Sequence, residues 1–210
     1  SLLHKKTALG HVRLSIIDLN RSANQPMLSN DGKLALSFNG EIYNYRDLKK
    51  ELKEYPFKTN SDSEVILAAY QKWGKDCLCK LNGMFSFVIY DKDSQTLFGA
   101  RDPFGVKPFY YCKTNEFFAF SSEIKGLLSI NKISPKLNEG VFYDFIAFNR
   151  TDHLEESCFK GVNNLRPGHC FKLNVEKNEI KFKKWYSGSS YDLSNKSYGE
   201  IKNSLKKKQI

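Results

Sequence analysis

The sequence predicts an α+β fold, in which strands and helices come in separate groups along the chain. Short apolar segments with strand-like patterns follow one another between residues 83 and 121, and again between 169 and 186. Segments with helical spacing gather at 44–73 and at 122–148. This grouping lacks the regular alternation of one strand and one helix, so it favours layered sheets and helices over a parallel α/β fold.

The composition is that of one globular domain. The 210 residues are 40% hydrophobic and 14% aromatic, enough to form a full core. No apolar run approaches the roughly 20 residues that cross a bilayer, and the first residues lack the order of a secretory signal, so no membrane partner is expected. The five cysteines are scattered and the four histidines show no ligand spacing. We therefore expect reduced thiols, no metal site and a cytoplasmic protein.

The net charge of +10, from 33 basic and 23 acidic residues, raises the question of nucleic acid. The lysines are spread along the chain and alternate with acids, as they do at residues 49–54. A nucleic-acid surface would need a continuous basic stripe, which this pattern does not indicate. No nucleic-acid partner is expected.

The first half of the chain predicts two strands and two helices. A buried strand is expected at 10–19, and a second at 33–38 that ends abruptly at Asn39-Gly40, a turn-like pair. Asn44 is expected to cap a short helix over 44–54. Residues 61–64 have the form of a capping box, in which the side chains of Ser61 and Glu64 each accept the backbone N–H of the other residue. A helix is expected to follow and to end at Gly74.

The second half predicts more strands, two short helices and a change of composition near residue 187. A hairpin is expected from 83–90 and 96–101, and the acid and base at Arg101-Asp102 are interpreted as structural. Further strands are expected at 109–112, 117–121, 169–174 and 179–186, with helices at 122–128 and 138–148. Residues 187–193 have the composition of a linker, and 194–209 have that of a separate helix.

Nine blocks of the sequence carry a family resemblance: 13–19, 25–27, 38–44, 61–66, 83–87, 101–111, 121–128, 165–169 and 185–186. Taken in order, they resemble the glutamine-hydrolysing domain of asparagine synthetases, which are class-II glutamine amidotransferases. The resemblance covers nearly the whole chain and implies that residues 1–186 form a four-layer αββα sandwich of the N-terminal-nucleophile hydrolase type, incomplete at its N-terminus. Residues 187–210 are implied to be a linker and the first helix of an ATP-dependent synthetase domain absent from the chain.

The resemblance also implies where glutamine binds. Arg13 is expected to hold the α-carboxylate through a planar two-pronged pair, while Asp62 binds the α-ammonium. Asn39 and Gly40 offer a side-chain amide and an approachable backbone N–H, which together would form an oxyanion hole. The pocket residues implied by the match are Arg13, Leu14, Ser15, Ile16, Ile17, Asn39, Gly40, Glu41 and Asp62.

The nucleophile of the family is a cysteine at the mature N-terminus, whereas the first cysteine of this sequence is Cys77. Ser1 corresponds to the interior of the family's domain, so it is not expected to substitute. We therefore expect a chain truncated at both ends that holds the glutamine pocket of a glutamine-hydrolysing asparagine synthetase and is inactive alone.

The resemblance implies that the parent protein amidates aspartate with ammonia from glutamine, using ATP and Mg in the absent synthetase domain, and that this chain holds no cofactor. Its expected partners are L-glutamine, its own C-terminal synthetase domain and a second copy in a homodimer. Two alternatives stay open: a non-catalytic domain that binds or senses glutamine, and an amidotransferase for another acceptor such as a sugar.

Overall fold

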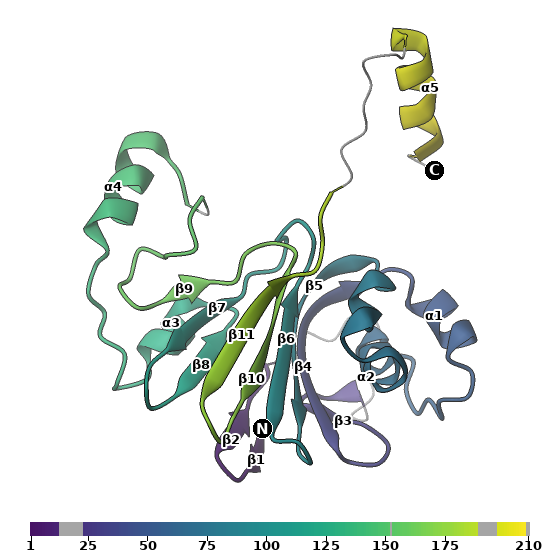
Figure 1. Ribbon diagram of the computed structural model, residues 1–210, viewed down its shortest axis with the longest axis horizontal. Coiled ribbons are helices and arrows are strands. Elements are labelled where there is room, and N and C mark those ends of the chain that lie inside the picture. The colour runs from purple at the N-terminus through teal and green to yellow at the C-terminus, as the bar shows by residue number, and fades with distance from the viewer. Residues whose placement is uncertain (13–22, 152, 189–196, 209–210) are drawn as a thin grey trace.

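The computed structural model describes residues 1–12, 23–151, 153–188 and 197–208. Its centre is a six-stranded antiparallel sheet in the order β11-β10-β6-β5-β4-β3 (Figure 1). The side chains of each central strand alternate between two buried faces, as at Ala35 and Leu36 on β4. The strands are β3 (Met27–Leu28), β4 (Leu34–Ile42), β5 (Gly83–Asp91), β6 (Thr96–Arg101), β10 (His169–Asn174) and β11 (Glu179–Lys184).

Helices α1 (Tyr45–Glu51) and α2 (Asp62–Trp73) cover one face of this sheet, with the 3-10 turn η2 (Gly74–Cys79) after them (Figure 1). The core on this side joins Val65, Ile66 and Ala69 of α2 to the phenylalanines of β4 and β5. These α2 positions follow helical spacing, and burying an apolar stripe against a sheet is what stabilises a helix of this length.

A second sheet and a short helix cover the other face. Its strands are β7 (Tyr110–Lys113), β8 (Phe118–Ser121) and β9 (Asn163–Asn164), and the hairpin of β1 (Leu2–His4) with β2 (Thr7–Leu9) pairs separately. Tyr111 packs toward the central sheet, whereas Cys112 packs with Leu127 of α3 (Ile124–Leu128). The layers therefore run helix, sheet, sheet, helix, and the expected αββα sandwich is confirmed.

Two further helices are described, α4 (Glu139–Phe148) and α5 (Tyr198–Lys208). α4 buries only Val141, and all four of its aromatic side chains are exposed. None of the helices in the described ranges is long and apolar enough to cross a membrane. All five cysteines are free thiols in the structure.

Most of the predicted helices and strands are present, but one predicted strand ends at the wrong residue, and another has no strand at the three positions that the structure describes. β4 does not end at Asn39-Gly40; it runs through both to Ile42, because β5 pairs with it from Leu34 onward without a break. Residues 10–12 have no regular structure, and Val12 is 97% exposed. The other residues of the strand predicted at 10–19, namely 13–19, lie outside the described residues.

The predicted capping box is only half present. The Ser61 hydroxyl accepts the N–H of Ser63 at 3.2 Å and so caps α2. Glu64 does not reach back to Ser61; its carboxylate accepts the N–H groups of Lys58 and Thr59, at 2.9 and 2.8 Å. The reason is that the chain before the helix folds over Glu64, which is buried, and fixes the loop instead.

Asn44 likewise makes no cap bond through its side chain. Its carboxamide holds the turn before β5, accepting the N–H of Asn82 at 3.0 Å and donating to Lys80 O at 2.9 Å. Because the carboxamide is used in these long-range bonds, α1 begins without a side-chain cap.

Asp102 anchors the loop that follows β6. Its carboxylate, which is 1% exposed, accepts four backbone N–H groups, two per oxygen, between 2.9 and 3.2 Å. Neighbouring Arg101 donates to three backbone carbonyls and to the side chain of Asn164. These bonds attach both side chains to the loop after β6 and to the segment at 164–165, in agreement with the structural interpretation of the pair. The four donors to Asp102 are Phe85, Phe104, Val106 and Lys107.

Asp102→Asn keeps the side-chain size but replaces one acceptor oxygen with a donor, which then faces backbone N–H groups. We expect the free energy of unfolding to fall by about 3 kcal/mol, since a buried network loses bonds and gains an unsatisfied group. Urea unfolding followed by circular dichroism measures this.

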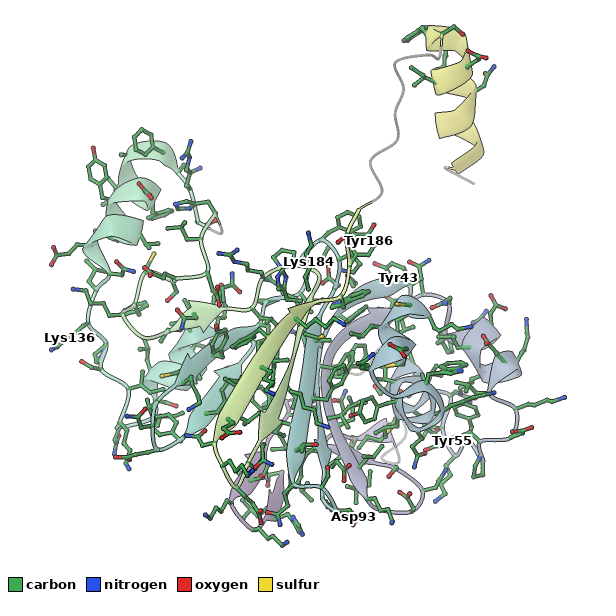
Figure 2. The ribbon with its side chains drawn as sticks, in the orientation of Figure 1. Tyr43, Tyr55, Asp93, Lys136, Lys184 and Tyr186 are labelled. Carbon is green, nitrogen blue, oxygen red and sulfur yellow. The ribbon has the colours of Figure 1, made fainter. Side chains whose placement is uncertain are left out.

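The matched control is Asp93→Asn, in the exposed turn between β5 and β6 (Figure 2), where Asp93 pairs with Lys33 at 2.7 Å. Its effect should stay within about 1 kcal/mol, as for other surface ion pairs. Equal effects of the two substitutions would contradict the anchoring role of Asp102.

Candidate functional site

A cavity of about 690 Å³ lies beside the middle of β4 and the start of α2. Its walls come from β4 and β5 in the central sheet, from the first turn of α2, and from the end of β8 with the start of α3. Segments far apart in the sequence therefore share one hollow. The main wall segments are residues 10–12, 37–41, 61–63, 86–88, 120–123 and 125–126.

Four of the predicted site residues, Asn39, Gly40, Glu41 and Asp62, line this cavity together. The other five, Arg13, Leu14, Ser15, Ile16 and Ile17, lie outside the described residues. The three residues that precede them, at 10–12, do line the cavity.

Gly40 occupies a position in β4 that no other residue fits. A Cβ atom there would lie 2.2 Å from the carbonyl oxygen of Met84, and the φ angle of +154° is rarely adopted by residues with side chains. The reason is the close approach of β5 at this point, where Phe85 pairs with Gly40. Glycine at this position therefore keeps the strand intact beside the cavity.

The Asn39 side chain is oriented by a partner from the turn between β8 and α3. Its Nδ2 donates to the Ser122 hydroxyl at 3.2 Å, a contact that spans 83 residues of sequence. An amide nitrogen carries two hydrogens, so one N–H of Asn39 is held while the other is left for a second acceptor. Both residues line the cavity, and a held amide is a preorganised hydrogen-bond donor.

Asp62 places a buried carboxylate at the start of α2. It is 5% exposed, and its Oδ2 accepts the N–H of Ile42 at 3.0 Å, which joins the helix to β4. Burial raises the pKa of this carboxyl above its ordinary value, and the charge of Glu41 acts in the same direction. The bond from Ile42 and the N–H groups at the helix start oppose that shift. A cation that enters the cavity would favour the ionised form.

Charges of both signs line the cavity. Glu41 and Asp62 contribute carboxylates, Lys107 contributes an ammonium group, and Glu123 pairs with Lys125 at 2.6 Å. Such a mixture suits a zwitterion such as an amino acid. No cysteine lines the cavity among the residues that the structure describes. In the same ranges, no three His, Cys, Asp or Glu side chains are grouped as a metal site would require.

Sequence reasoning did not single out Ser122 or Gln25, although both line the cavity. Both lie in blocks that carry the family resemblance, at 121–128 and 25–27, so their place in these blocks could have indicated a role in the site. Their partners are distant in sequence, at Asn39 for Ser122 and at Phe38 for Gln25. Local pattern could not reveal these contacts.

Comparison with known proteins gives consistent matches. The family model described as "Glutamine amidotransferase domain" matches residues 1–186. An asparagine synthetase (glutamine-hydrolysing) of Bacillus subtilis is 35% identical over 80% of this chain and 28% of its own length. A putative asparagine synthetase of Methanocaldococcus jannaschii is 44% identical over 62% of this chain and 28% of its own length. The chain thus spans little more than a quarter of these relatives.

Solved structures agree in fold. Glutamine phosphoribosylpyrophosphate amidotransferase from B. subtilis superposes with a TM-score of 0.59 at 22% identity, covering 85% of this chain and 34% of that one. At this identity the likeness speaks for the fold alone. The family match covers the whole cavity and both sheets, so the chain belongs to the class-II glutamine amidotransferase domain family.

Proposed function

We propose that the cavity binds L-glutamine and that this chain is the glutamine-binding part of a glutamine-hydrolysing asparagine synthetase. The observation that carries the proposal is the meeting of Asn39, Gly40 and Asp62 in one cavity of a glutamine amidotransferase domain. Asp62 is distant in sequence from the Asn39-Gly40 pair and comes from a different layer, the helix α2 and not the strand β4.

The two ends of glutamine need different contacts. Asp62 offers a buried carboxylate for the α-ammonium, and such a pair is strong where water is excluded. Arg13, with the backbone of Leu14, Ser15, Ile16 and Ile17, is proposed for the α-carboxylate on the basis of the sequence match. In the sequence it directly follows residues 10–12, which line the cavity, and this supports the role.

At the amide end, the Asn39 side chain and the Gly40 N–H are proposed to stabilise the oxyanion that forms when the amide carbonyl is attacked. Glu41 is proposed as a further wall residue that contacts the ligand. Hydrolysis also needs a nucleophile and a base. Because no cysteine lines the cavity among the described residues, we expect the chain alone to bind glutamine without turning it over.

The wider function is proposed from the named relatives. The protein that carries this domain would pass ammonia from glutamine to an ATP-dependent synthetase domain, where ATP and Mg activate aspartate for amidation. No cofactor is proposed for the chain itself. A homodimer in the cytoplasm is the proposed setting.

The proposal is tested by measuring the binding of L-glutamine to the purified chain with titration calorimetry. The Asp62→Asn variant tests the site. The variant keeps an oxygen for the Ile42 N–H but loses the charge that pairs with the α-ammonium. Affinity should fall about 10-fold to 100-fold, the range for a hydrogen bond to a charged group. Helix stability should change far less.

The control is Asp47→Asn, because Asp47 also lies in the first turn of a helix, α1, yet is exposed and pairs with Lys50. It should leave glutamine affinity unchanged. Absence of binding by the unaltered chain would overturn the proposed function. Equal affinity losses in the two variants would remove Asp62 from the site.

The raised pKa of Asp62 predicts opposite pH dependences for stability and for binding. The folded chain holds this proton more tightly than the unfolded chain, so the free energy of unfolding falls as pH rises from the ordinary carboxyl range through the raised pKa. Glutamine affinity rises over the same range, because binding needs the carboxylate. Asp62→Asn should lack both dependences, which unfolding and calorimetry in a pH series would measure. A parallel course of stability and affinity would contradict this.

Asn39→Ala tests the oxyanion role in the protein that carries this domain together with the family's N-terminal cysteine. Removing the amide should lower kcat for glutamine hydrolysis by about 10²-fold to 10³-fold and leave KM nearly unchanged, since the oxyanion exists only beyond the ground state. Steady-state ammonia release measures both. The control is Asn30→Ala, because the Asn30 amide donates to Pro56 O away from the cavity. A change in KM alone would assign Asn39 to ground-state binding.

A further inference from the structure

Gln25 completes an edge of β4 that β3 leaves open beside the cavity. The pairing of β3 with β4 ends at Met27, opposite Leu36, and the next residue back is Pro26, which has no N–H to donate. Continuing the same register by two residues places Gln25 opposite Phe38. There the side-chain carboxamide supplies both partners: Oε1 accepts the Phe38 N–H at 2.6 Å, and Nε2 donates to Phe38 O at 3.1 Å.

The same edge carries the backbone donor proposed for the oxyanion. In an antiparallel strand, every second residue directs its N–H to the same side. On the side of β4 away from β5, the Phe38 N–H is held by Gln25 and the Ile42 N–H by Asp62. Gly40 stands midway between them and lines the cavity, so the alternation directs its N–H to this edge. Gln25 and Asp62 therefore flank the Gly40 donor.

Gln25 also reaches the helix that carries Asp62. Its Nε2 lies 3.5 Å from the hydroxyl oxygen of Ser63, which is buried in the first turn of α2. One carboxamide thus contacts the strand with the proposed oxyanion donors and the helix with the proposed ammonium acceptor. Helix α2 lies over the central sheet next to strand β4 (Figure 1).

We propose that Gln25 is a positioning residue for glutamine, which fixes the Gly40 N–H relative to Asp62 so that the ligand's amide carbonyl and α-ammonium are engaged together. The proposal rests on the proposed function of the cavity. A carboxamide here also has a plainly structural use, because Phe38 is 4% exposed and its backbone groups need partners. The positioning role predicts in addition that loss of this carboxamide weakens glutamine binding even when the chain still folds.

The test compares Gln25→Ala and Gln25→Glu with Gln71→Ala in the 210-residue chain. Gln25→Glu keeps the size and the acceptor for the Phe38 N–H, but turns the donor into an oxygen that faces the Phe38 carbonyl. Gln71 lies on α2, outside the cavity wall, and also makes one side-chain bond, to Asp31 at 3.1 Å. Calorimetry with L-glutamine should show affinity lowered at least about tenfold in both Gln25 variants, the effect of one net hydrogen bond, and unchanged in Gln71→Ala.

A second readout separates positioning from folding. In nitrogen-15 spectra, L-glutamine should move the Gly40 amide resonance in the unaltered chain and in Gln71→Ala. Saturating glutamine should no longer produce this shift in Gln25→Glu. A purely structural role would lower the melting temperature and leave the bound-state Gly40 resonance in place. Should Gln25→Ala fail to fold, Gln25→Glu decides, because it retains the bond from Phe38.

The outcomes are distinct. If the unaltered chain does not bind glutamine, the proposed function of the cavity fails. If that chain binds glutamine and folded Gln25→Glu binds it equally well with an unchanged Gly40 shift, only the positioning role of Gln25 is overturned.

Discussion

The unbroken pairing of β4 with β5 is the constraint on which the site depends. It runs from Leu34 opposite Asp91 to Ile42 opposite Gly83 and holds the strand between two buried faces. Because β5 takes every second N–H of β4, the remaining ones all emerge on one edge. β3 covers only part of that edge, and side chains from elsewhere serve the rest. The cavity therefore lies at an edge of β4 where pairing with β5 fixes the direction of the backbone N–H groups but does not use them as donors.

Sequence pattern predicted the elements that have a strong local signal. Helix α2 has a capping serine, an apolar stripe and a stopping glycine, and its predicted bounds are confirmed. β10 has the predicted bounds as well. Strands of two or three residues, such as β3 and β9, were not predicted, because they are too short to show a period. Their position is set by partners that are distant in the chain.

The course of β4 through Asn39-Gly40 shows why local reasoning failed at the site. An Asn-Gly pair ordinarily favours a tight turn, because both residues tolerate positive φ. Here β5 approaches so closely that only glycine fits beside the Met84 carbonyl, and the strand continues. The residue types at the site could be predicted from the family resemblance, whereas the geometry that gives them a use could not. Ser122 and Gln25 were missed for the same reason, since their bonds join distant segments.

Two buried carboxylates show how this fold separates stability from binding. Asp102 is enclosed by four backbone N–H groups and faces only protein, so its burial is offset within the fold. Asp62 is nearly as buried, but it lines the cavity, and burial dominates the raised pKa of its carboxyl. A carboxylate whose ionised form is disfavoured in the empty protein gains most from a cationic ligand, because the partner restores what water no longer supplies. The cost at Asp62 is therefore of the kind that an α-ammonium group would offset on binding.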